Sequence, residues 1–125
     1  MKLIEAVNAY AAAEEMSKES WPYSVSLALV KLKKALKDEA EFFLTKEREL
    51  VDRYALKDER GNIMLTERGT FTLRDGAQAA EYEQARQELC QTEAPAKWTP
   101  MRVAAPACIK PAFLEALDGF IEFQA

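Results

Sequence analysis

The stretch "SVSLALVKLKKALKDEAEFFLTKEREL", residues 24–50, decides the fold. Neither glycine nor proline occurs between Tyr23 and Leu56, so the sequence predicts one helix from about Pro22 to Leu56. At 1.5 Å per residue, a helix of this length extends over roughly 50 Å. A domain of this size has a radius of gyration of roughly 14 Å. We therefore expect the helix to be longer than the rest of the domain is wide.

The apolar residues of this helix change their pattern halfway along. In the first half they alternate spacings of four and three, which is typical of coiled-coil-like packing: Val25, Leu29, Leu32 and Leu36. In the second half Glu39 and Lys46 interrupt one of the two rows, and only the row of Phe43 and Leu50 continues. The first half is therefore predicted to be ordinary core, and the second half to meet its neighbours more thinly.

Three consecutive large apolar residues, Phe42, Phe43 and Leu44, lie at the middle of the helix. They span about 200° of its circumference, because each residue advances by about 100°. One neighbouring element cannot cover all three. Either the sheet and a second helix of the same chain enclose this point, or another subunit or partner does. Burial of each side chain contributes about 1.5–3 kcal/mol, so exposed ones would promote association.

The remaining chain predicts shorter elements. Residues 2–18 form a first helix, with an inward stripe of Leu3, Val7, Tyr10 and Ala11. Residues 62–73 form a β-hairpin, Asp75 caps a helix at 76–92, and 98–104 are extended. "IKPAFLEALDGF" forms a short helix, and "FIEF" adds a strand. The predicted fold is α+β: a single domain, 1–125, in which a helical hairpin with one long helix packs on a small antiparallel sheet, plus a third helix and a short C-terminal helix.

The composition argues against an enzyme. The chain has no histidine, which removes the commonest general base and nearly all catalytic zinc sites. Four isolated glycines cannot build a phosphate-binding loop, and no cofactor is predicted. Acidic pairs such as Asp38 with Glu41 or Glu47 with Asp52 are interpreted as surface carboxylates rather than a metal site. A net charge of −4 makes nucleic acid an unfavourable partner.

Several residues are candidates for binding. Lys31, Lys33, Lys34 and Lys37 form either a strip facing phosphates or, as we favour, a solvated face with the pairs Lys34–Asp38 and Lys37–Glu41. Trp21 and Trp98 lie in proline-flanked turns and either anchor a partner or close the ends of the core. Cys90 and Cys108 are interpreted as small buried hydrophobic residues. The partner-binding candidates are Phe42, Phe43, Leu44, Trp21 and Trp98.

The sequence gives no sign of a membrane segment or a signal peptide. Glu5 and Asn8 interrupt the apolar residues near the N-terminus, and no stretch approaches the roughly 18 apolar residues of a membrane span. A cytosolic location is therefore predicted.

Residues 21–62 resemble a family of small proteins encoded by tailed phages and prophages of Gram-positive bacteria. The matching positions are Pro22, Leu29, Lys33, Lys34, Glu47, Tyr54, Gly61 and Asn62. A weaker match covers residues 109–123, with Leu114, Leu117 and Ile121. The family has no established catalytic residues, so the resemblance implies none here.

The resemblance implies a phage-encoded protein in the cytoplasm of a bacterial host, where two functions compete. One is an inhibitor that docks on a host defence effector, of the anti-CRISPR type. The other is a phage morphogenesis component, for example in tail assembly, or a homo-oligomeric structural protein. A third class, a nucleotide-sequestering protein, would require Arg68, Arg74 and Arg102 to converge in the fold.

Overall fold

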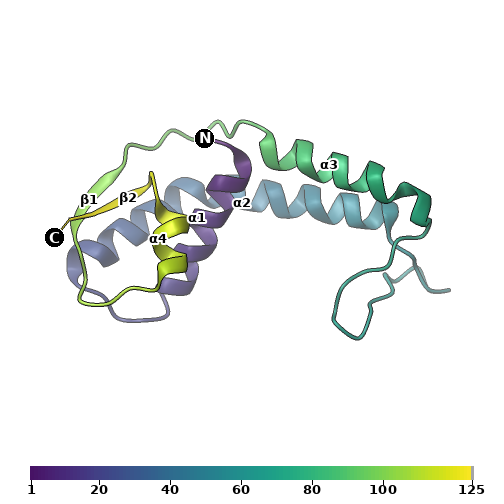
Figure 1. Cartoon of the computed structure of the whole chain (residues 1–125), viewed down its shortest axis with the longest axis horizontal. Coiled ribbons are helices and arrows are strands. Elements are labelled where there is room, and N and C mark those ends of the chain that lie inside the picture. The colour runs from purple at the N-terminus through teal and green to yellow at the C-terminus, as the bar shows by residue number, and fades with distance from the viewer. Residues whose placement is uncertain (125) are drawn as a thin grey trace.

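The computed structural model describes residues 1–124 and is elongated, with the C-terminal end of the chain at one end of the molecule and the N-terminus nearer its middle (Figure 1). Its elements are α1 (Leu3–Met16), α2 (Tyr23–Tyr54), a 3₁₀ helix η1 (Gly76–Gln78), α3 (Ala79–Gln91), β1 (Met101–Ala104), α4 (Pro111–Leu117) and β2 (Ile121–Gln124). We call α1, the first half of α2, α4 and the two strands the head. The second half of α2 and α3 form the arm, and residues 55–75 form the tip loop.

The long helix predicted from the sequence is confirmed. α2 runs unbroken through 32 residues, or about 48 Å at the standard rise, and belongs to both the head and the arm. Its first half contacts α1 and its second half contacts α3. The predicted seam of Val25, Leu29, Leu32 and Leu36 is fully buried in the head. In the arm fewer apolar side chains of α2 are covered, as the interrupted pattern predicted.

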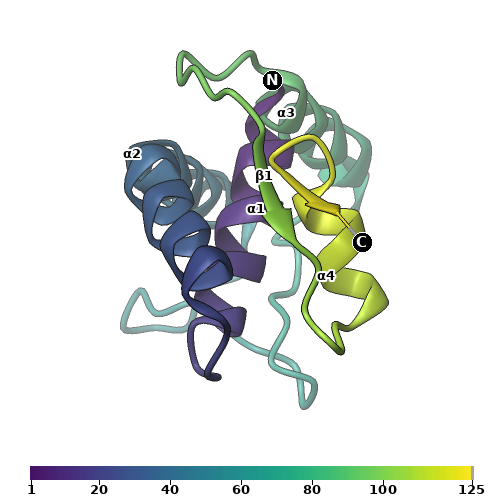
Figure 2. The ribbon, with the colours of Figure 1, turned by 90° about the vertical axis from the view of Figure 1, so that its left-hand side faces the viewer.

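The helical hairpin of α1 and α2 is present, but the prediction for the buried face of α1 was wrong in part. The buried residues are mostly alanines and lie on two sides of the helix: Leu3, Ala6, Ala9, Ala12, Ala13 and Met16. Val7 and Tyr10 are only half-buried, and Ala11 is exposed. The reason is that α1 lies between α2 and the layer made by α4 and the strands (Figure 2). Alanine allows close approach on both sides, whereas larger side chains would not fit.

The prediction of an antiparallel sheet was wrong. The sheet consists of β1 and β2 in parallel, with Met101 opposite Ile121 and Ala104 opposite Gln124. The connection through residues 105–120 contains α4 and exceeds the roughly dozen residues that a parallel crossover needs. The sheet is a minor element beside the helices. It contributes Val103 and Ile121 to the core of the head.

The predicted hairpin at 62–73 does not form paired strands. The tip loop instead has isolated antiparallel bridges, Ala55 with Leu73, Lys57 with Ile63, and Leu65 with Phe71. A two-stranded ribbon needs an apolar layer to pack against, and Leu65 at the tip is 65% exposed. On the other side of the Leu65–Phe71 bridge, Phe71 anchors the loop by packing edge-on against Tyr82 of α3.

The start of the third helix agrees with the sequence. The Asp75 side chain accepts a hydrogen bond from the Ala77 amide at 3.0 Å, at the beginning of η1, and α3 follows directly. Tyr82 is buried between the Tyr54 and Phe71 rings, while Ala85 and Leu89 are half-buried. This face of α3 therefore lies against α2.

Candidate functional site

The three consecutive apolar residues at the middle of α2 are divided by the fold. Phe43 is 3% exposed and packs with Leu3, Cys90 and Ala94 in a small cluster separate from the core of the head. Phe42 is 48% exposed and Leu44 is 46% exposed, on opposite flanks of the helix. The expectation that one neighbouring element cannot cover all three residues is thus met, and the chain encloses only the middle one.

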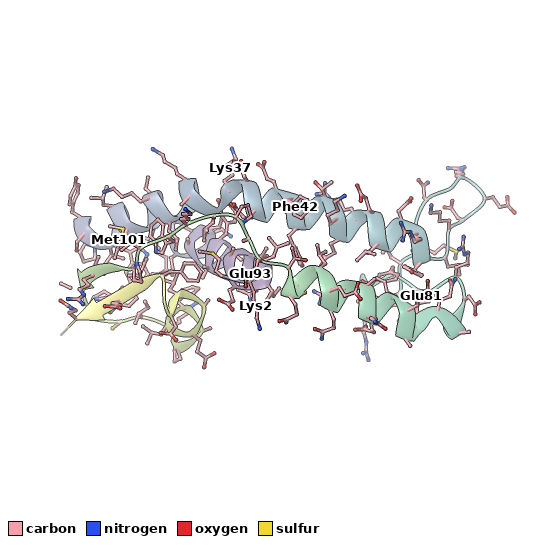
Figure 3. The ribbon with its side chains drawn as sticks, turned by 90° about the horizontal axis from the view of Figure 1, so that it is seen from above. Lys2, Lys37, Phe42, Glu81, Glu93 and Met101 are labelled. Atoms are coloured by element: carbon pink, nitrogen blue, oxygen red, sulfur yellow. The ribbon has the colours of Figure 1, made fainter. Side chains whose placement is uncertain are left out.

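This point of α2 lies where its two covering helices end. α1 begins at Leu3 and α3 ends at Gln91. The chain that leaves α3 is attached to the start of α1, because the Leu3 amide donates to the Thr92 carbonyl at 2.7 Å and the Ala94 amide donates to the Met1 carbonyl at 3.0 Å. Figure 3 shows Glu93 in this segment beside Lys2, with Phe42 on α2 nearby.

A cavity of about 410 Å³ opens between α2 and this segment. Phe42 forms one wall, and the complete lining is Leu3, Asp38, Glu39, Phe42, Thr92, Glu93, Ala94 and Pro95. Its size is within the usual range of ligand pockets, about 300–1,000 Å³. The walls are apolar, and all three charged residues of the lining are acidic.

Of the three acidic residues in the cavity lining, only Glu93 forms an ion pair within residues 1–124. Glu93 pairs with the N-terminal ammonium group at 3.2 Å. Neither Asp38 nor Glu39 takes part in an ion pair within residues 1–124. The Oε2 atom of Glu39 is buried and has no hydrogen-bond partner in the part of the chain that the structure describes. A buried carboxylate oxygen without a donor is unfavourable.

The four lysines do not form one strip. Lys33 is turned towards α1, with its Nζ 3.9 Å from Glu14 Oε1. Lys37 forms the expected pair with Glu41 at 3.9 Å and points away from the rest of the molecule in Figure 3. Lys31 and Lys34 are exposed, but the expected pair of Lys34 with Asp38 is absent among the described residues. The solvated-face interpretation therefore describes this region better than a phosphate-binding strip.

Both tryptophans lie against the core of the head. Trp21 donates from Nε1 to the Met16 carbonyl at 2.7 Å, and Trp98 donates to the Phe120 carbonyl at 2.8 Å. Each is half-buried and packs against the apolar cluster of the head. With their N–H groups already bonded, the indoles have the arrangement of residues that close the ends of a core.

Other candidate groups are dispersed. Cys90 is buried as predicted, whereas Cys108 is exposed, so the prediction for Cys108 was wrong. Arg68 and Arg74 belong to the tip loop, while Arg102 lies on β1 and pairs with Glu122 at 3.2 Å. These three arginines are at opposite ends of the molecule and build no common pocket (Figure 1). Within residues 1–124 no three His, Cys, Asp or Glu side chains are placed to hold a metal ion.

Comparison with known proteins gives no family for this chain: no family model, curated protein or solved structure matches it. None of the helices within residues 1–124 combines the length and apolar character required to cross a bilayer.

Sequence reasoning found Phe42 but missed the wall opposite it. Residues 93–95 lie between the predicted elements at 76–92 and 98–104, and nothing in their composition indicates that they meet α2. In the segment "TEAP" the only indication of a binding site is weak: one charged residue, Glu93, lies between small residues just after the end of a helix. The cavity depends on a contact between residues about 50 positions apart, and local patterns do not report such contacts.

Proposed function

We propose that this chain is a non-enzymatic binding protein that docks on another protein through the exposed surface at the middle of α2. The observation that carries the proposal is the exposure of Phe42 beside an apolar cavity of about 410 Å³. Interface cores are enriched in aromatic side chains that fill or flank pockets. Phe42 and the cavity together provide such an anchor, and Leu44 extends the apolar surface to the opposite flank.

The chemistry of the chain agrees with binding rather than catalysis. Acid–base catalysis most often uses histidine, which the sequence lacks. Glu47 and Asp52, one of the acidic pairs that the sequence suggested, are engaged in separate surface ion pairs, Glu47 with Arg86 at 3.4 Å and Asp52 with Lys57 at 2.8 Å. Such pairs hold elements together and do not form a reaction site.

The resemblance to the phage family supports a more specific proposal. In that setting the protein acts in the cytoplasm of the bacterial host and inhibits a defence effector, in the manner of an anti-CRISPR protein. A nuclease effector presents basic surfaces that bind nucleic acid. A small acidic protein with a net charge of −4 has a complementary charge, and its docking would exclude the nucleic acid.

The test is affinity purification from infected host cells with the wild-type chain and with the variants Phe42→Asp and Leu44→Asp. Both positions are about half exposed, so the variants should fold, which circular dichroism would verify. We expect a stoichiometric defence effector in the wild-type sample and its loss from the Phe42→Asp sample. Lys31→Ala, at an exposed position of the same helix away from Phe42, leaves the acidic side chains intact and is the control that should retain the partner. Retention of the partner by both apolar variants would refute the proposed surface.

A second candidate, a morphogenesis component or homo-oligomer, is favoured by the shape of the molecule. The arm extends away from the head, and Met64 and Leu65 of the tip loop are 45% and 65% exposed. An elongated protein with apolar residues at its far end could link copies of itself or contact a virion protein. Large rings in light scattering, or the chain itself in purified virions, would favour this candidate. A monomer that captures a defence effector would argue against it.

A further inference from the structure

We infer that a second copy of this chain docks on the outer side of α2 in an antiparallel orientation, so that the two long helices pair about a two-fold axis near Glu39. The inference goes beyond the proposed function, because it uses the flank of α2 that carries Leu44 and leaves Phe42 free for another protein. It follows from the order of the charges along α2 and from a row of exposed side chains on the same helix.

The two halves of α2 carry opposite charge. Residues 23–37 contain four lysines and no acidic residue, and residues 38–54 contain six acidic and three basic residues, which gives net charges of +4 and −3. Lys33 pairs with α1 and Glu47 pairs with α3, and without these two the halves still have +3 and −2. A parallel pair of such helices would place like charges together, whereas an antiparallel pair places each basic half against the acidic half of the other copy. The charges of α2 are therefore complementary to those of a second copy only in the antiparallel orientation.

One row of side chains on α2 has the spacing of a seam between two helices. Its members follow one another by three or four residues, as those of the buried seam do, and we call them the outer row: Leu27, Val30, Lys34, Lys37, Glu41 and Leu44. Leu27 is half-buried and the other five are exposed, with Val30 at 44% and Leu44 at 46%. Figure 3 shows Lys37 pointing away from the head and from α3. This side of α2 is therefore open to a second helix.

The charged members of the outer row are available to a second copy. Lys34 takes part in no ion pair within residues 1–124. Lys37 and Glu41 pair with each other at 3.9 Å, and their side chains remain 62% and 63% exposed. An exposed pair on one helix contributes only about 0.3–0.5 kcal/mol, so both side chains can exchange partners at little cost.

An axis near Glu39 joins these groups in complementary contacts. It lies at the middle of α2, so the whole helix takes part in the pairing. Lys37 of one copy then lies opposite Glu41 of the second copy, and the two-fold axis repeats this contact. In the same register Lys34 lies opposite Leu44, and Val30 lies opposite Arg48. Lysine and arginine cover apolar surface with their methylene groups, so these contacts shield the two exposed apolar residues from water.

The experiment is sedimentation equilibrium of the full chain, alone and as charge-reversal variants. The wild-type chain should dimerise, and the dimer should weaken as salt is added, because exposed charges are screened. Lys37→Glu and Glu41→Lys should each weaken the dimer by about tenfold or more, because each places like charges together at both copies of the contact. An equimolar mixture of the two variants should form a heterodimer, since the acidic residues of one variant then face the lysines of the other.

Control variants separate the outer row from the rest of the surface. Glu67→Lys makes the same change of net charge as Glu41→Lys, but it lies in the tip loop and should leave the dimer intact. Leu44→Asp should abolish the dimer, whereas Phe42→Asp, on the opposite flank, should leave it intact. The inference is overturned by a wild-type chain that stays monomeric in low salt up to about 1 mM. It is also overturned by a mixture of charge variants that associates no better than each variant alone.

The orientation is measured with a spin label on Ser24→Cys in a Cys108→Ser background, since the remaining Cys90 is buried. Ser24 lies near the start of α2, so in the antiparallel dimer the two labels should be separated by roughly 45 Å, the length of about 30 helical residues. A parallel pair would bring them within roughly 20 Å, about two helix diameters, and would overturn the antiparallel assignment.

The outcomes also distinguish this inference from the proposed function. If Leu44→Asp abolishes the dimer and no captured protein depends on Phe42, the pairing of α2 stands and the docking function falls. If Phe42→Asp loses a captured protein while the wild-type chain never dimerises, the docking function stands and the pairing falls. A dimer that is lost in Phe42→Asp and kept in Leu44→Asp would place the second copy on the other flank, which overturns the inference.

Discussion

Substitution of Phe42, Phe43 and Leu44 by alanine, one at a time, tests the structure at its most informative point. Phe43 is 3% exposed, and Phe43→Ala should lower the free energy of unfolding by about 3–5 kcal/mol, because it removes a ring and leaves a void. Phe42 is 48% exposed, so Phe42→Ala loses about half of a full burial energy, or about 1 kcal/mol. Leu44→Ala should cost about the same as Phe42→Ala. Neighbouring positions should therefore differ by at least about 2 kcal/mol.

The assay is urea unfolding followed by circular dichroism at 222 nm, with the slopes compared so that free energies refer to the same transition. Phe43→Leu keeps most of the side-chain volume and remains measurable if Phe43→Ala does not fold. Equal losses for Phe42→Ala and Phe43→Ala would refute the assignment of Phe42 to the surface. A loss for Phe42→Ala that grows with protein concentration would instead show that a second copy covers it.

Three further outcomes are expected. Leu36→Asp should abolish the folded far-UV spectrum, because Leu36 is fully buried and a carboxylate there has no partner, whereas Leu44→Asp should leave the spectrum intact. Gly119→Ala should lower the unfolding free energy by about 1–2 kcal/mol in the same urea assay, because Gly119 has a φ of +81° and a Cβ there meets only open space, so backbone strain alone acts. Burial raises the pKa of the Tyr82 hydroxyl in the folded chain. The stability that the neutral hydroxyl contributes is therefore complete below the pKa of the unfolded chain and is lost as the pH rises through the pKa of the folded chain. Tyr82→Phe should remove that alkaline loss, which urea unfolding at about pH 9 to 12 would measure.

The long helix could be predicted because its evidence is local. The absence of glycine and proline set its length, and the row of apolar residues set the face that meets α1. The helix after Asp75 and the turn at Gly119 were also local signals, a side-chain cap and a residue suited to positive φ. Each of these features depends on neighbours a few positions away, which a single sequence displays.

The errors concern contacts between distant residues. The predicted antiparallel sheet included the hairpin at 62–73, but the sheet that forms is β1 and β2 in parallel, joined by a connection through α4. The buried side of α1 was assigned to its larger residues, whereas the fold places a layer on each side and selects alanine. The cavity at Phe42 was missed for the same reason, because its second wall comes from residues 92–95, far from Phe42 in the sequence.

The exposure at the middle of α2 follows from how the chain covers this helix. α1 covers the first half and α3 the second half, and both terminate near Phe43. A helix end contributes only a few side chains, so Leu3, Cys90 and Ala94 can cover one residue of the helix circumference but not its neighbours. Folding does not require large apolar residues at positions 42 and 44, since polar residues there would satisfy the same helix with little loss of stability. Phenylalanine and leucine at these two positions are therefore the residues for which we propose a contact outside the chain.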